Sequence, residues 1–330
     1  MSEAMFDLVS VARRGPGRRD KLSPSEIAQI ARTTQRVPEA MVKVLSKGAT
    51  TSRAVKRHLD YVGRHGELEL ETDDGTRLHG DDVGAKLTED WDLDIEEDRL
   101  QPDLSASRGR APAKLVHKLI FSMPPGTSPS GVLAAVRNFA REEFALKHRY
   151  AFALHTDEPH PHVHVVVKAM GEHGQRPYIR KATLREWRSE FARHLRDQGI
   201  AANATPRYVR GETKPQKLDG IYRAALRGQS SHMRGRVEFV AGELSRGALR
   251  AEPGKAKMLQ TRHEVQRAWQ DVSDILVREG QSDLSAEVKK LAEAMRRPMT
   301  DREWMAEGIV ERAREPRYRE GPIHRQPYVR

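Results

Sequence analysis

The chain has 330 residues, a formal net charge of +11 and no cysteine, and 37% of its residues are hydrophobic. The lack of cysteine excludes disulfide scaffolds, thiolate zinc sites and cysteine nucleophiles, so any metal ion must be held by histidine, carboxylates or water. The surplus of Lys and Arg favours polyanionic partners, chiefly nucleic acid.

Two features bear on the compartment. The sequence has no apolar run of about 18 residues that could span a bilayer, and Met1 to Asp20 lacks an apolar core followed by a small-residue cleavage site. We therefore expect a soluble, cytoplasmic protein with no membrane insertion.

Residues 1–38 read as a basic N-terminal arm that ends in a short helix. Ser23 can cap that helix, Pro24 suits its first position and Glu26 can close a capping box. We predict no chemistry for this arm.

A regular succession of elements begins at Ala40. Alternating side chains predict strands, and apolar residues at helical spacing predict helices. Thr183 and Glu186 form a second capping box, which predicts that a helix begins there. The acidic segment at about 73–103, anchored by Trp91, reads as a surface insertion that is partly helical. The expected strands are 41–45, 67–70, 115–123, 150–154 and 163–168, and the expected helices are about 52–64, 130–147 and 183–198.

This order of elements predicts an α+β domain with a mostly antiparallel central sheet flanked by helices. We assign the domain to residues 39–213, with the insertion inside it. Strand signals fade beyond it, so residues 214–330 predict a helical accessory region with a basic tail. Its helices are expected near 257–279, 285–297 and 301–314.

The segment HTDEPHPHVHVVV, residues 155–167, holds four of the fourteen histidines. Side chains alternate along a strand, so His162 and His164 point to the same face, about 7 Å apart at the backbone. His155 ends the preceding strand and can return as a third ligand if the intervening loop folds the two strands into a hairpin. Three neutral imidazoles would leave coordination positions open for a phosphate oxygen and water. The segment therefore predicts a metal site.

Two further residues belong to this segment. His160 shares the parity of His162 and His164, but it lies between two prolines, where strand alternation is unreliable. Asp157 is a plausible acceptor that orients an imidazole. Which three of the four histidines bind the metal stays open at this point.

A metal ion that polarises a phosphodiester still needs a nucleophile, and Tyr61 is the candidate. It lies in a predicted helix among Lys56, Arg57 and Arg64, whose charges can gather DNA phosphates. From its own surroundings in the sequence, however, a helical tyrosine is more often a half-buried packing residue.

Three blocks of the chain resemble the conjugative relaxases and mobilisation nucleases of the HUH endonuclease superfamily, in particular the branch that includes the T-DNA border endonuclease. The blocks are LDYVGRHGELEL at 59–70, HKLIFSMPPGT at 117–127 and the histidine segment at 155–167. The last, with its His-x-Asp-x-x-His-Pro-His-x-His spacing, is the most specific. The resemblance covers about Ala40 to Gly211.

The resemblance implies a mechanism. Tyr61 would attack one strand at an origin of transfer, leaving a 5′-phosphotyrosyl bond and a free 3′-hydroxyl, and the reverse reaction would rejoin the ends. A divalent ion, Mg²⁺ or Mn²⁺, would be held by His155, His162 and His164, and no organic cofactor is implied. Asp157 would orient His155 or help take the tyrosine proton, and His160 would be a supporting or base residue.

The chain departs from the family pattern in two ways. An arm of roughly 40 residues precedes the match, where family members often have the tyrosine close to the N-terminus. Lys168 stands after the valine run, where an asparagine is common, and could contact a phosphate instead.

The expected partners are single-stranded or supercoiled DNA at an origin of transfer, accessory relaxosome proteins and a secretion-system coupling protein. Two alternatives stay open. One is a rolling-circle replication initiator or transposase-type nuclease, against which the tyrosine-first order argues. The other is a non-catalytic DNA-binding module with a structural histidine-metal site.

Overall fold

The structure is a computed structural model that describes residues 21–45, 49–100, 113–213, 224, 227–247 and 249–314. The first twenty residues of the predicted arm and the basic tail after residue 314 lie outside the described residues. The described chain divides into two compact units, with the boundary between Thr205 and Pro206.

The first unit is built on a six-stranded sheet with the strand order β1-β4-β6-β5-β2-β3. Every neighbouring pair of strands in it is antiparallel, which confirms the predicted α+β class with an antiparallel sheet. The strands are β1 (Met41–Val44), β2 (Leu70–Thr72), β3 (Arg77–Leu78), β4 (Val116–Ser122), β5 (Tyr150–His155) and β6 (His162–Lys168).

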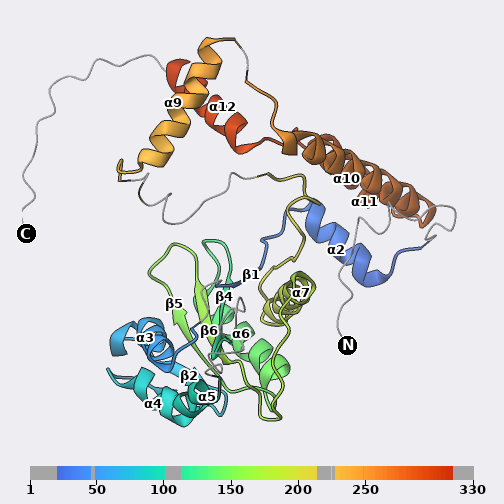
Figure 1. Ribbon diagram of the computed structural model, residues 1–330. Coiled ribbons are helices and arrows are strands. Elements are labelled where there is room, and N and C mark those ends of the chain that lie inside the picture. The colour runs from blue at the N-terminus through green and yellow to red at the C-terminus, as the bar shows by residue number, and fades with distance from the viewer. Residues whose placement is uncertain are drawn as a thin grey trace, which may run out of the picture. The chain divides into compact units, whose positions relative to one another are not determined.

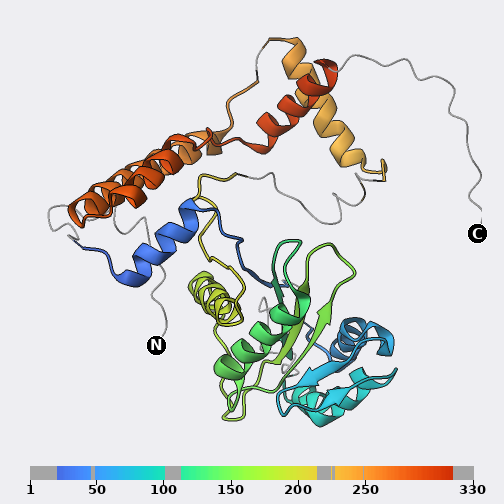
Figure 2. The same ribbon diagram turned by 180° about the vertical axis from the view of Figure 1, so that it is seen from behind.

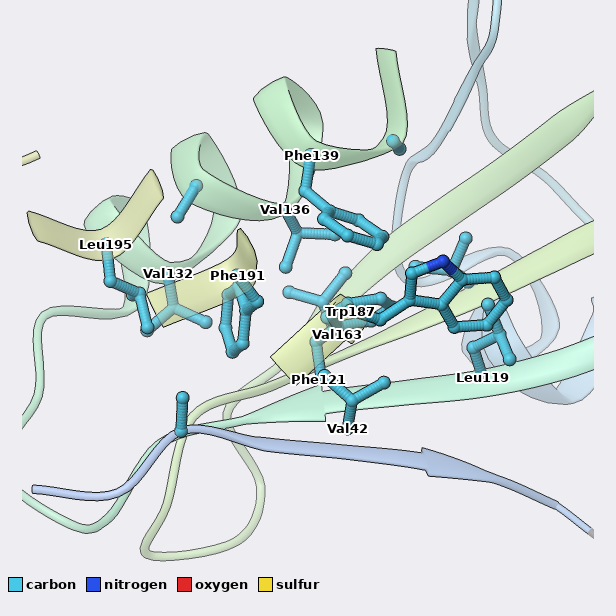
Figure 3. Packing of buried hydrophobic residues seen from close by; sticks show 14 of the residues in the cluster. Val42, Leu119, Phe121, Val132, Val136, Phe139, Val163, Trp187, Phe191 and Leu195 are labelled. Atoms are coloured by element: carbon cyan, nitrogen blue, oxygen red, sulfur yellow. The ribbon is translucent and has the colours of Figure 1, made fainter. Parts of the chain in front are cut away.

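Both faces of the central strands are buried, so helices cover each face. On one face α6 (Pro129–Phe144) and α7 (Lys181–Asp197) pack on the sheet, and Phe121 of β4 lies 4.9 Å from Phe139 and 5.2 Å from Phe191 between ring centroids (Figure 3). The other core forms around Leu59 and Trp91, on the face covered by the helices α3 (Ser52–Val62), α4 (Val83–Asp90) and α5 (Leu93–Leu100) (Figures 1 and 2).

Helix α2 (Pro24–Thr34) begins as predicted. The Ser23 hydroxyl accepts from the Glu26 amide at 3.3 Å, and the Glu26 carboxylate accepts from the Ser23 amide at 2.8 Å. The Thr33 hydroxyl meets that of Thr205 at 2.9 Å, so the helix is attached to the segment that follows α7.

The second unit is helical, as predicted. Helices α10 (Pro253–Arg278) and α11 (Ser282–Glu293) lie side by side, with the Ser273 and Ser285 hydroxyls 2.8 Å apart (Figure 1). The Trp269 indole N–H donates to the Val209 carbonyl at 2.8 Å. The other two helices are α9 (Ser231–Ser245) and α12 (Asp301–Arg314). Within the described residues, none of the helices is long and apolar enough to cross a membrane.

Three local expectations were wrong. Helix α7 begins at Lys181, so Thr183 is not its cap; the Thr183 hydroxyl accepts from the Arg180 amide at 3.3 Å from inside the first turn. Helix α3 ends at Val62, two residues early, because Arg64 adopts a left-handed backbone conformation with φ of 50°. Helix α9 was not predicted, since its buried residues are Val240 and Glu243 and it shows no continuous apolar face.

Candidate metal centre and nucleophile

The predicted β5–β6 hairpin forms and brings the histidines together. Residues 156–161 make the loop, and the register pairs His155 directly with His162 and Ala153 with His164. Because side chains on an antiparallel pair alternate in step, all three imidazoles lie on one face of the sheet. This is the face that α3 covers.

The three histidines form a compact and buried donor set. One ring nitrogen from each of His155, His162 and His164 lies within 4.8 Å of those of the other two. Their ring centroids are 4.5 Å apart for His155 and His164, 5.2 Å for His155 and His162, and 5.3 Å for His162 and His164. Among the described residues this is the group of His and carboxylate side chains that could hold a metal ion.

Hydrogen bonds fix which nitrogens carry a lone pair. The Nε2 of His155 donates to the Val62 carbonyl at 2.8 Å, so its Nδ1 carries the lone pair. The Nδ1 of His162 donates to the His160 carbonyl at 3.3 Å, which leaves Nε2 for a ligand. The Nδ1 of His164 is buried and has no hydrogen-bond partner within the described part of the chain. This arrangement fits a metal ion. A metal-bound imidazole is oriented by a hydrogen bond from its second nitrogen, as in His155 and His162, and a bound ion would satisfy a buried nitrogen that has no other partner.

The electrostatic setting favours the neutral form of His155 and His164. Burial, together with the neighbouring His155 and His162, lowers the pKa of His164 to about 3. Burial also lowers the pKa of His155. Neutral imidazole is the form that ligates metals, so His155 and His164 do not have to lose protons to bind an ion near neutral pH.

Tyr61 lies beside this cluster, at the last turn of α3. Its ring centroid is 6.0 Å from that of His164 and 6.4 Å from that of His155. The residue is 46% exposed, whereas its helix neighbours Leu59 and Val62 are fully buried. The phenol therefore faces the cluster from the open side and does not fill the core.

Arg64 links the tyrosine to the histidine hairpin. Its guanidinium lies 5.3 Å from the centre of the Tyr61 ring, forms an ion pair with Asp157 and donates to His155 Nδ1 at 3.3 Å. The left-handed turn at Arg64 and His65 turns the chain sharply after α3. A non-glycine residue in that conformation is uncommon and costs free energy, so the surrounding contacts must hold it there.

The remaining predicted residues lie at different distances from the cluster. The His160 ring is 5.5 Å from that of His162, and the Asp157 carboxylate is 3.9 Å from His155 Nδ1. Lys56 and Arg57 are exposed on α3. Lys168 is six positions from His162 along β6, about 20 Å by strand geometry, so the structure does not bring it to the cluster.

Two residues near the site were missed by the sequence analysis. His58 is one helical turn before Tyr61, and the two rings stack with centroids 6.1 Å apart. Burial and the nearby Lys118 ammonium lower the pKa of His58 to about 4. His58 is three residues before Tyr61, a spacing that places both side chains on one side of a helix, so the sequence could have indicated it. Lys118 could have been indicated by side-chain alternation along β4, but only once the register of β4 against β6 was known.

The first unit thus places three convergent imidazoles and an adjacent phenol on one face of an antiparallel sheet. Residues 85–200 match the family model described as "Relaxase: MobA/VirD2-like, nuclease domain". Residues 85–200 are thus similar to the MobA/VirD2-like relaxase nuclease domain, and the three histidines lie within the matched residues while Tyr61 precedes them.

Two curated proteins to which the chain is similar are named VirD2, one of the two names in the family description. The chain is 30% identical to the T-DNA border endonuclease VirD2 of Agrobacterium fabrum over 220 residues, which cover 59% of this chain and 46% of that protein. It is 29% identical over 197 residues to the T-DNA border endonuclease VirD2 of Rhizobium rhizogenes, covering 52% of this chain and 42% of that one. The chain therefore spans less than half the length of these relatives.

Proposed function

We propose that this protein nicks and rejoins one strand of DNA at an origin of transfer by tyrosine transesterification. The observation that carries the proposal is the placement of Tyr61, half-exposed, with its ring 6.0 Å from that of His164 and beside a buried three-histidine donor set. The relaxase nuclease domain supports a DNA substrate.

Tyr61 would be the nucleophile. Its phenolic oxygen would lose its proton to a base, Asp157 or His160, and form a bond to the scissile phosphorus. The bond from phosphorus to the 3′-oxygen would break, and the 3′-oxygen would take up a proton. The 5′ end would stay joined to Tyr61, so the phosphodiester energy would be kept for the reverse reaction. The half-exposed ring leaves room for a strand to approach from solvent.

His155, His162 and His164 would hold a divalent ion, Mg²⁺ or Mn²⁺. When bound, the ion would supply Lewis-acid stabilisation of charge on the phosphate oxygens. The Val62 and His160 carbonyls would keep the two neighbouring imidazoles in the ligating orientation.

Asp157 and His160 would support the site. Through its ion pair with Arg64 and its place 3.9 Å from His155, Asp157 would hold both side chains near the phenol. His160 lies against His162 and would act as a supporting or base residue. Arg64, Lys56 and Arg57 would contact phosphates, with Lys168 as a more distant contact.

Further parts of the proposal concern the rest of the chain. Residues 39–213 would form the relaxase domain and residues 214–330 an accessory region for partners. Those partners would be relaxosome proteins and a secretion-system coupling protein in conjugative transfer or mobilisation.

The test is a tyrosine exchange with a matched control. The substrate is a supercoiled plasmid that carries the DNA on either side of the gene encoding this protein, and the reaction contains Mg²⁺ or Mn²⁺. Wild type and Tyr178→Phe, an exposed tyrosine outside the site, should give a nicked plasmid with protein covalently bound to the 5′ end. Tyr61→Phe should give neither. Covalent adduct with Tyr61→Phe, or a mass-spectrometric link to another residue, would contradict the proposal.

A further inference from the structure

The sheet face in front of Tyr61 carries positive charge. Between α3 and the edge strand β1, the residues of β1 and β4 on this face are Met41, Lys43, Lys118, Ile120 and Ser122, as the register of the two strands shows. None of them is acidic. Lys43 is exposed at the sheet edge, and Lys118 is half-buried closer to α3.

Lys118 lies close to the candidate metal centre. The register pairs Ile120 with His164 and Lys118 with Val166, so Lys118 and His164 are diagonal neighbours on one face. Such neighbours are about 7 Å apart, within reach of a long side chain. The charge of Lys118 also acts on His58, which stacks on Tyr61. Lys118 is therefore a diagonal neighbour of one of the three histidines and acts on the ring that stacks on Tyr61.

The Lys118 ammonium has no ion-pair partner among the residues that the structure describes. Burial lowers its pKa, and no carboxylate contributes to the shift. A half-buried cation without a counter-ion is unfavourable, and an anion placed beside it would offset that cost.

We propose that Lys118 binds a backbone phosphate of the DNA strand immediately beside the scissile one, with Lys43 contacting the next phosphate toward the sheet edge. This inference rests on the proposed function, because it identifies the surface along which the strand would reach Tyr61. A DNA strand that lies on this face would place one phosphate at the histidines and the neighbouring phosphates along β4 and β1. Lys118 is a diagonal neighbour of both His164 and Lys43, so each step of this path is about 7 Å, a distance that one nucleotide of an extended strand can span.

The experiment measures binding separately from cleavage. In the Tyr61→Phe background, which cannot form the covalent bond, affinity for single-stranded origin DNA is measured at several salt concentrations. Lys118→Met keeps the aliphatic stem and removes the charge. It should reduce the slope of log K against log salt by about 0.7, the value of one phosphate contact on a single strand. Lys118→Arg should preserve the slope, and Lys147→Met, in the loop before β5, should leave it unchanged.

A phosphate scan identifies the partner of Lys118. Oligonucleotides that each carry one neutral methylphosphonate are compared for the two proteins. For the protein with Lys118, one substitution next to the nick should weaken binding about fivefold to tenfold, and for Lys118→Met that same substitution should have no further effect. Equal losses at every position for both proteins would overturn the inference. An unchanged salt slope in a Lys118→Met protein with normal melting would also overturn it.

The two proposals can fail separately. If wild type forms the Tyr61 adduct but the phosphate scan is identical for Lys118→Met, the nicking function stands and Lys118 has no phosphate partner. If no adduct forms with wild type, the nicking function fails, and the scan still tests whether Lys118 binds DNA.

Discussion

The two ring nitrogens of His155 have different surroundings, and that difference defines how the site is assembled. The Nε2 hydrogen is taken by the Val62 carbonyl at the end of α3, and the Nδ1 lone pair accepts from Arg64. The same carbonyl is one residue from Tyr61. A single hydrogen bond therefore couples the orientation of a proposed metal ligand to the helix that carries the proposed nucleophile.

Metal binding should depend on each of the three histidines. Mn²⁺ at about one hundred times its dissociation constant should stabilise wild type by about 2.7 kcal/mol, which raises the melting temperature by several degrees. His162→Ala and His164→Ala should lose most of this rise, since two imidazoles bind more weakly than three. His173→Ala, exposed in the loop after β6, is the control and should keep it. A full Mn²⁺ shift in His164→Ala would show that the cluster is not the metal site.

The folded protein should become less stable as the pH falls, because the buried imidazole of His117 on β4 resists protonation. Burial, with Lys114 and His148 nearby, lowers the pKa of His117 from 6.5 to about 4. Between these values the unfolded chain binds a proton that the folded protein does not, so stability is fully present above pH 6.5 and is lost as the pH falls toward 4. The contribution is on the order of 2 kcal/mol. In melting curves without added metal, His117→Gln should lose less stability than wild type over this range; equal losses would contradict the assignment.

At the scale of elements, α4 supports the helix that carries Tyr61. The Gly84 amide donates to the Asp60 carboxylate at 3.1 Å. A β carbon at Gly84 would lie 2.2 Å from that carboxylate oxygen and 2.6 Å from the Lys56 carbonyl. Because the second contact is backbone, α3 and α4 would have to separate.

Gly84→Ala should therefore lower stability by about 1–3 kcal/mol, the usual cost of overpacking, and reduce adduct formation by moving Tyr61 relative to the histidines. Gly235→Ala is the matched control. It lies within α9 with no heavy atom within 4 Å of the added carbon, so removing a helical glycine there should be neutral or stabilising by about 0.5–1 kcal/mol. Thermal melting and adduct assays check both variants. Normal melting and adduct yield in Gly84→Ala would refute the dependence of Tyr61 on α4.

Periodicity was enough to predict some elements but not their mutual register. The alternation around His162 and the short loop after His155 predicted the hairpin, because a two-residue period and a loop are local properties. The position of Lys118 against His164 depends on the pairing of β4 with β6, which are separated by α6 and β5 in sequence. The left-handed turn at Arg64 is maintained by contacts with Asp157 and His155, which no local pattern indicates.

At the scale of the whole molecule, the site residues and their supports all lie in the first unit. That unit has its own two cores, one on each face of the sheet. Its N-terminal helix α2 is attached to the segment after α7, where the Asn203 side chain donates to Thr33 at 3.0 Å and the Asn203 amide donates to the Pro38 carbonyl at 2.9 Å. Both cores and this attachment are complete before Pro206.

A chain that ends at Thr213 should therefore fold and form the covalent adduct with single-stranded origin DNA at a rate within about threefold of the full chain. The Trp269 contact to Val209 is lost, but both residues belong to the second unit and neither touches the histidine hairpin. Circular dichroism and melting establish folding, and Tyr61→Phe in the same shortened chain gives the background. Supercoiled plasmid is a second substrate, and a loss of nicking confined to it would assign residues 214–330 to duplex opening. A folded shortened chain that fails on single-stranded DNA as well would place part of the catalytic apparatus beyond Thr213.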